Sequence, residues 1–196
     1  MKALEERILR DGLAIGTEVL KVDSFLNHQI DTKFLIEMGE EFHNLFAGTA
    51  PTKVLTMESS GISIAVITAI RFGYLPVVFA KKTDARTLSE EIYAAPVKSF
   101  TRGTVHTARV DKKFLSSEDR VLIIDDFLAH GEAASALAEI VQQAGATLVG
   151  IGEVVEKAYQ GGREKLAAYG APVISLARVG KIEDGNIRFL PADEAK

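Results

Sequence analysis

Short runs of β-favouring residues alternate with helix-like stretches from Lys53 onward. The runs that predict strands are residues 53–57, 76–81, 120–124, 147–155 and 173–177. This alternation is typical of a parallel sheet with helices on its faces. Residues 121–124 are all apolar, as expected for a central strand that is covered on both sides. The pattern therefore predicts an α/β fold around a central, mostly parallel sheet.

Three further stretches carry helical patterns. Residues 61–72 are apolar nearly all round, which predicts a buried helix, and residues 132–144 are rich in alanine and stop at Gly145, a good helix end. Ahead of the first strand, apolar residues recur at helical spacing and form one stripe: Phe34, Leu35, Met38, Phe42, Leu45 and Phe46. We interpret this stripe as a face that packs into the core.

Two segments are less regular. Residues 83–109 are polar, with only weak strand candidates at 97–100 and 104–110. The residues of this segment with the most chemical interest are Arg86, Arg102 and His106. A segment this long inside a compact domain is usually either a functional lid or a hairpin. Residues 179–182 and 187–190 flank an Asp-Gly pair, which predicts a second hairpin.

Composition narrows the class of protein. The chain has 196 residues, 47% of them hydrophobic, which suits one well-buried core and a single domain spanning 1–196. Its 23 basic and 27 acidic residues offer no electrostatic footprint for nucleic acid or an anionic membrane. The absence of cysteine excludes disulfides, thiolate metal sites and cysteine nucleophiles. We see no signal peptide or membrane span, and expect a cytoplasmic protein.

The most informative run is residues 121–134. A buried strand is followed by Asp125 and Asp126, then by a short loop with Gly131, and a helix is predicted to begin near Glu132. In open α/β sheets, ligands bind beyond the carboxyl ends of the strands. The free amides and the dipole of the helix start favour an anion there, and Gly131 allows the chain to curl around a phosphate.

Two adjacent carboxylates beside an anion site suggest a sugar phosphate. Ribose hydroxyls are donors and carboxylates are acceptors, so Asp125 and Asp126 could hold the sugar while the loop binds its phosphate. They would also stabilise the positive charge that develops when a group leaves the anomeric carbon. The alternative is a solvated turn or a helix cap. A response regulator is excluded, because no aspartate occurs between Asp126 and Asp184 to accept a phosphoryl group.

This strand-loop-helix run resembles the signature of the type I phosphoribosyltransferases. The usual signature has threonine at the position of His130, glycine at that of Glu132 and threonine at that of Ala133. The same departures occur in the bacterial xanthine-specific branch of the family. Residues 19–31, 58–62 and the pair Glu156-Lys157 also resemble that branch, and the resemblance runs essentially from end to end.

The resemblance implies a type I phosphoribosyltransferase fold, with a small hood over the base site built from residues 1–30 and the C-terminal segment. It implies transfer of the 5-phosphoribosyl group from 5-phosphoribosyl 1-diphosphate to xanthine, which gives xanthosine 5′-monophosphate and pyrophosphate. Hypoxanthine or guanine as the base, and a non-catalytic regulator that senses the sugar diphosphate, remain alternatives. The resemblance also implies a homodimer.

The family pattern assigns roles to individual residues. The catalytic pair is Asp125 and Asp126, and the 5-phosphate loop is Ala129, His130, Gly131, Glu132 and Ala133. The pyrophosphate loop is Glu58, Ser59, Ser60 and Gly61. From their position and charge, and not from the family pattern, Lys81, Lys82 and Arg86 could close over the pyrophosphate. The base contacts are Leu20, Asn27 and Lys157. We expect Mg²⁺ to arrive with the diphosphate, since no all-protein carboxylate cage is visible.

For several of these positions, the residue type alone is equally consistent with an ordinary structural role and no contact with substrate. Ser59 or Ser60 could be a helix cap, and the lysines could form a solvated cluster. Lys157 could be a solvated strand end, and Asn27 a turn residue. Leu20 could pack in the core.

Overall fold

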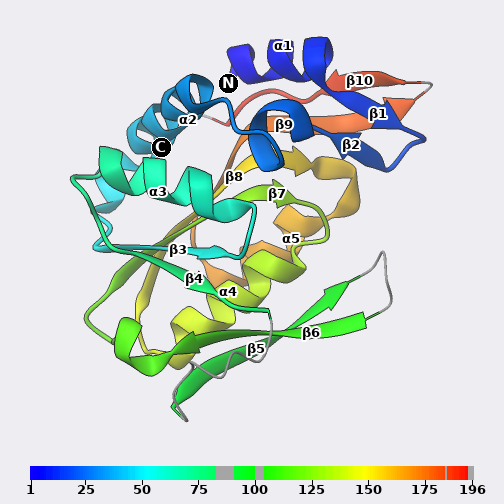
Figure 1. Cartoon of the computed structure of the whole chain (residues 1–196). Coiled ribbons are helices and arrows are strands. Elements are labelled where there is room, and N and C mark those ends of the chain that lie inside the picture. The colour runs from blue at the N-terminus through cyan, green and yellow to red at the C-terminus, as the bar shows by residue number, and fades with distance from the viewer. Residues whose placement is uncertain (83–90, 100–103, 184, 194–196) are drawn as a thin grey trace.

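The computed structural model describes residues 1–82, 91–99, 104–183 and 185–193 (Figure 1). Its elements before the central hairpin are α1 (Lys2–Asp11), β1 (Leu13–Ile15), β2 (Val19–Lys21), a π-helical turn (Asp23–Asn27), α2 (Thr32–Phe46), β3 (Lys53–Met57), α3 (Gly61–Arg71) and β4 (Val77–Ala80). Those that follow are β5 (Ile92–Ser99), β6 (Thr104–Asp111), β7 (Arg120–Leu128), α4 (Glu132–Gln143), β8 (Thr147–Lys157), α5 (Gly162–Leu166), β9 (Val173–Glu183) and β10 (Asn186–Phe189). Short 3-10 turns lie at Ala47–Thr49, Lys112–Phe114, Ala158–Gln160 and Ala167–Tyr169.

A six-stranded sheet in the order β10-β9-β8-β7-β3-β4 forms the centre of the molecule. Neighbouring strands are parallel, except that β10 pairs with β9 in the antiparallel sense. The mostly parallel sheet expected from the sequence is confirmed. Residues 173–177 and 179–182 were predicted as separate strands, and that is wrong. They form the single strand β9, because its ladder with β8 continues through Arg178 to Val179.

Helices cover both faces of the sheet, with α2 and α3 on one face and α4 on the other (Figure 1). On β8, two glycines make room for aromatic rings of α2. A Cβ added at Gly150 would come within 2.5 Å of the Phe46 ring, and one at Gly152 within 2.9 Å of the Phe42 ring. The apolar stripe of α2 is therefore a core face, as expected, and it lies directly on the sheet.

The N-terminal elements and the hairpins surround the sheet. In Figure 1, α1, β1 and β2 lie beside β9 and β10, while β5 and β6 form a separate two-stranded sheet at the far end of the molecule. Of the two expectations for residues 83–109, the hairpin is the one observed, and β5 begins earlier than predicted, at Ile92. Arg86 and Arg102 lie outside the described residues. None of the helices within the described ranges is both long and apolar enough to cross a membrane.

Candidate active site

The paired aspartates lie within a strand, which corrects the expectation that the strand ends before them. β7 continues to Leu128 because its hydrogen-bonded ladder with β8 extends to Glu156. Asp125 is only 5% exposed, and the Asp126 amide donates to Asp125 Oδ1 at 3.0 Å. Asn27 Nδ2 donates to Asp126 Oδ2 at 3.1 Å, which joins the N-terminal segment to the sheet at this point.

Burial governs the protonation of the pair. Burial raises the pKa of Asp125 well above its usual value, and the charge of Asp126 raises it further. Burial also raises the pKa of Asp126, although the hydrogen bond from Asn27 opposes the increase. Ionising both carboxyl groups at once is therefore costly in the free protein, and a positive charge placed beside them would reduce that cost.

The loop between β3 and α3 packs against Asp125. A Cβ added at Gly61 would lie 2.1 Å from Asp125 Oδ1 and 2.2 Å from Thr56 Oγ1, so this position accepts only glycine without displacement. Glu58 Oε1 accepts a hydrogen bond from the Lys82 amide at 2.6 Å, and the peptide bond between Glu58 and Ser59 is cis. The loop expected to bind pyrophosphate thus adjoins the acidic pair.

The helix cap considered for this loop is not observed. α3 begins at Gly61 with Ser60 at the N-cap position, and no side-chain cap hydrogen bond is found there within the described part of the chain. Ser59 contributes its carbonyl, which accepts from the Ile62 amide at 3.2 Å. The serine hydroxyls are therefore not committed to capping this helix.

The loop after β7 surrounds a hollow of about 670 Å³. Gly131 has φ +77°, a left-handed conformation that favours glycine, and α4 begins immediately after it at Glu132. All five residues of the expected 5-phosphate loop line the hollow: Ala129, His130, Gly131, Glu132 and Ala133. The N-terminus of α4, with its free amides and favourable dipole, therefore opens on a space large enough for a ligand.

Lys157 lines the same hollow. It is the last residue of β8, two positions beyond the predicted strand, and its Nζ donates to the Glu18 carbonyl at 2.7 Å. Burial lowers the pKa of its ammonium, while the charge of Glu18 opposes that effect. The ammonium also lies 5.7 Å from the centre of the Phe127 ring, a hollow-lining side chain that sequence reasoning did not single out.

The other residues that were expected to contact the substrates lie in different parts of the structure. Lys82 lines the main hollow, whereas Lys81 lines a second one of about 380 Å³, and its backbone pairs with Arg109. Leu20 is 6% exposed and belongs to the hydrophobic core, while its neighbour Val19 lines the main hollow. Lys82 and Lys157 therefore line the same hollow, whereas Lys81 and the Leu20 side chain do not.

A buried acid near the pair was missed by sequence reasoning. Glu153 is 1% exposed and lies opposite Asp125 in the β7–β8 register. Its Oε2 has no hydrogen-bond partner among the described residues. Burial raises its pKa well above the usual value, and the charge of Asp125 adds to the increase. The available signal was an acidic residue in the otherwise apolar run of residues 147–155.

The described residues contain no group of three or more His, Cys, Asp or Glu side chains that could hold a metal ion. The atoms of the candidate site that could bind a metal are carboxylate oxygens. These suit Mg²⁺ when a bound substrate supplies further oxygens.

Comparison with known proteins identifies similar chains. A family model described as "Phosphoribosyl transferase domain" matches residues 21–175. A protein of Ruminiclostridium cellulolyticum named xanthine phosphoribosyltransferase is 53% identical, covering 96% of this chain and 99% of its own. A Streptococcus pneumoniae protein of the same name is 51% identical, covering 98% of this chain and all of its own (100%).

The fold recurs in solved structures. Adenine phosphoribosyltransferase from Rhodothermus marinus superposes with a TM-score of 0.72 at 23% identity, covering 91% of this chain and 100% of that one. This likeness confirms the fold class expected from the sequence.

Proposed function

The chain belongs to the phosphoribosyltransferase family, and we propose that it transfers the 5-phosphoribosyl group of 5-phosphoribosyl 1-diphosphate to xanthine. The products are xanthosine 5′-monophosphate and pyrophosphate, and the chain is a pentosyltransferase of purine salvage. The observation that carries the proposal is that the loop of residues 129–133 and Lys157 line the same hollow. Relatives named for this activity support xanthine as the base.

The loop of residues 129–133 binds the 5-phosphate. None of its five residues carries a side-chain hydroxyl group, so backbone amides at the start of α4 supply the hydrogen bonds. Gly131, in its left-handed conformation, turns the chain from the loop into the first turn of α4, where the free amides lie. The helix dipole adds a favourable interaction with the phosphate charge.

Asp125 and Asp126 hold the ribose hydroxyls and stabilise the transition state. The raised pKa values of both groups mean that ionising them costs more in the free protein than it would in water. As pyrophosphate departs, positive charge develops at the anomeric carbon and the ring oxygen, and this charge compensates the buried carboxylates. The pair therefore stabilises the transition state more than the ground state, which is the requirement for catalysis.

Lys157 and Asn27 recognise the base. The Lys157 ammonium now donates to a backbone carbonyl, and a purine carbonyl oxygen is an equivalent acceptor. Asn27 can donate and accept together, which suits an oxopurine edge, and its contact with Asp126 fixes it near the sugar. The base nitrogen N9 then attacks the anomeric carbon, the imidazole proton of the base is released to solvent, and the electron pair of the broken C–O bond leaves with pyrophosphate. Positioning supplies much of the rate.

The loop of Glu58, Ser59, Ser60 and Gly61 receives the pyrophosphate at the start of α3. Lys82, which is tied to Glu58 through its amide, adds a positive charge beside it. Mg²⁺ bound to the diphosphate oxygens would neutralise the leaving group, with the substrate rather than a protein cage as its main ligand.

The proposal is tested by assaying nucleotide formation with xanthine, hypoxanthine and guanine at one concentration of the sugar diphosphate. We expect xanthine to be preferred. Asp126→Asn should lose most of its turnover while keeping its melting temperature within a few degrees of the parent. A preference for guanine would overturn the assignment of the base, and unchanged turnover in the variant would remove the acidic pair from the mechanism.

The proposal also includes a cytoplasmic homodimer. The homodimer follows from the family resemblance, and light scattering on the purified chain measures it directly, with the mass of one chain at 21.2 kDa as the reference. A mass that stays near this value at micromolar concentration would contradict the dimer.

A further inference from the structure

Two positions at which the 5-phosphate loop departs from its family pattern contact the same neighbouring segment. His130 Nδ1 lies 3.1 Å from the carbonyl oxygen of Gln160, and Glu132 Oε1 lies 2.6 Å from Lys165 Nζ. Both partners belong to residues 158–166, which form the 3-10 turn after β8 and helix α5. We call this stretch the support segment.

The backbones of the loop and the support segment are packed as closely as glycine permits. A Cβ added at Gly162 would lie 2.3 Å from the Ala129 carbonyl oxygen and 2.9 Å from the Gly131 amide nitrogen. A Cβ added at Gly131 would come within 3.0 Å of the Gly162 carbonyl oxygen. The position of the loop is thus set by backbone contact as well as by its two side chains.

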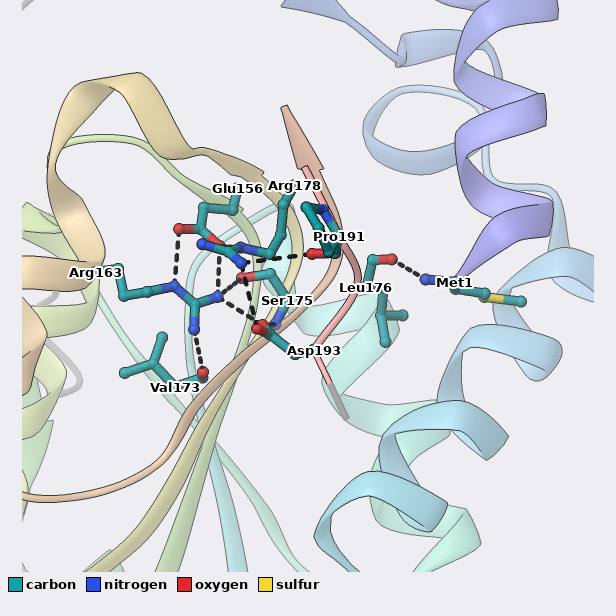
Figure 2. Close-up of polar contacts among 9 residues, drawn as sticks. All are labelled: Met1, Glu156, Arg163, Val173, Ser175, Leu176, Arg178, Pro191 and Asp193. Carbon is teal, nitrogen blue, oxygen red and sulfur yellow. Dashed lines mark hydrogen bonds and ion pairs between the residues drawn. The ribbon is translucent and has the colours of Figure 1, made fainter. Parts of the chain in front are cut away.

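Arg163, the next residue after Gly162, fixes the support segment to the sheet (Figure 2). Its guanidinium donates to both carboxylate oxygens of Glu156, at 2.9 and 2.5 Å, and to the Val173 carbonyl at 2.6 Å. Glu156 is 2% exposed. Burial alone would raise the pKa of Glu156, but Arg163, Ser175 and Arg178 together outweigh it and hold that pKa below its usual value, with Arg163 as the first of the three. A planar, bidentate pair of this kind allows little movement.

We propose that Gly162, Arg163 and Lys165 are positioning residues that hold the 5-phosphate loop in its binding shape before the substrate arrives. The inference rests on the proposed function, because it concerns the phosphate that this loop is proposed to bind. Without side-chain hydroxyls in the loop, recognition of the phosphate depends on where the amides point. A rigid support removes the cost of ordering them on binding.

The first test is Gly162→Ala, which inserts a methyl group between the support segment and the loop. We expect binding of ribose 5-phosphate, measured by calorimetry, to weaken about tenfold or more, because small displacements of binding groups have large effects. Binding of pyrophosphate, which uses the loop at Glu58, should stay within about twofold. The matched control is Gly48→Ala, since a Cβ added at Gly48 meets no described atom within 4 Å.

The second test uses an exposed contact, so that folding is not at risk. Lys165→Met removes the partner of Glu132, and we expect ribose 5-phosphate to bind about threefold more weakly, as fits an ion pair that is partly exposed. In the Glu132→Gln background the same substitution should have little effect, because no carboxylate remains to be held. Lys181→Met, which breaks the exposed pair with Glu183, is the control.

The outcomes separate this inference from the proposed function. If Gly162→Ala and Lys165→Met bind ribose 5-phosphate as the parent does, or lose ribose 5-phosphate and pyrophosphate to the same extent, the positioning role is wrong. The parent would still form nucleotide in either case. If the parent itself neither binds ribose 5-phosphate nor forms nucleotide, the proposed function fails, and the inference fails with it.

Discussion

Glu153 is an acidic side chain that lies almost fully buried in strand β8 of the central sheet. It lies between Asp125 and Ser175 across three neighbouring strands, in register with both. One of its carboxyl oxygens, Oε2, has no hydrogen-bond partner among the described residues, so ionising this buried group is costly. Its raised pKa means that the folded chain binds this proton more tightly than the unfolded chain does. Stability is therefore highest below the unfolded pKa and falls as the pH rises from there toward the folded pKa.

Glu153→Gln should remove that pH dependence. The neutral amide keeps the shape of the side chain and cannot ionise, so we expect the variant to gain stability over the parent as the pH is raised from 5 to 8. A gain of about 1 kcal/mol corresponds to roughly 2–4 °C in the melting temperature of a chain of this size. Glu118→Gln, at an exposed position, should show no such trend. A difference that stays constant with pH would argue against a protonated Glu153.

Lys157→Ala tests base recognition at a single position. The ammonium is proposed to donate to a xanthine oxygen, and a hydrogen bond from a charged group contributes about 1.5–3 kcal/mol, so we expect KM for xanthine to rise about tenfold or more. KM for the sugar diphosphate should change little. Lys33→Ala, exposed on α2, serves as the control. Equal increases in the two KM values would count against the assigned contact.

At the scale of elements, the sequence predicted the interiors of strands better than their ends. Apolar runs identified β3, β7 and β8, but β7 and β8 continue through charged residues such as Asp126 and Glu156. A strand persists wherever its neighbours supply ladder hydrogen bonds, and hydropathy does not report those neighbours. Helix α1 was missed for a related reason. It is largely charged, and the residues it buries are Leu4 and Ile8.

The candidate site was predictable where its residues are neighbours in the chain. The run from Asp125 to Ala133 was recognised as a unit because strand, turn and helix signals follow one another there. Contacts between distant segments were not predictable. The bond from Lys157 to the Glu18 carbonyl and the contact of His130 with Gln160 join residues that only the folded chain brings together. The support segment therefore carried no signal in the sequence.

Gly61→Ala tests the junction between the β3–α3 loop and β7. The added methyl group would overlap Asp125 Oδ1 and Thr56 Oγ1, so either the loop or the carboxylate must move. We expect turnover to fall at least about tenfold, because the loop and the acid pair must keep their relative positions. Pyrophosphate should also bind more weakly, in contrast to Gly162→Ala. Near-normal turnover would mean that the junction can relax without consequence.

At the scale of the whole molecule, the first and last of the described residues, Met1 and Asp193, both contact β9. The N-terminal ammonium of Met1 donates to the Leu176 carbonyl. Near the other end, Asp193 Oδ2 accepts from the Ser175 amide at 2.8 Å and from Arg163 at 2.6 Å (Figure 2). These contacts tie the N-terminal elements and the C-terminal segment to the same strand, beside the support segment.

Asp193→Asn separates the role of the C-terminal segment in stability from any role in catalysis. The variant weakens the ion pair with Arg163 and the hydrogen bond from Ser175, and both groups are largely buried, so we expect a loss of about 1 kcal/mol, or roughly 2–4 °C in melting temperature. Glu183→Gln, which breaks an exposed pair, should change the melting temperature by much less.

Because Arg163 keeps both bonds to Glu156, the support segment should stay in place, and KM for the sugar diphosphate should remain close to that of the parent. A marked rise in that KM would mean that the C-terminal segment helps to hold the phosphate loop, and that Arg163 depends on Asp193 as much as on Glu156.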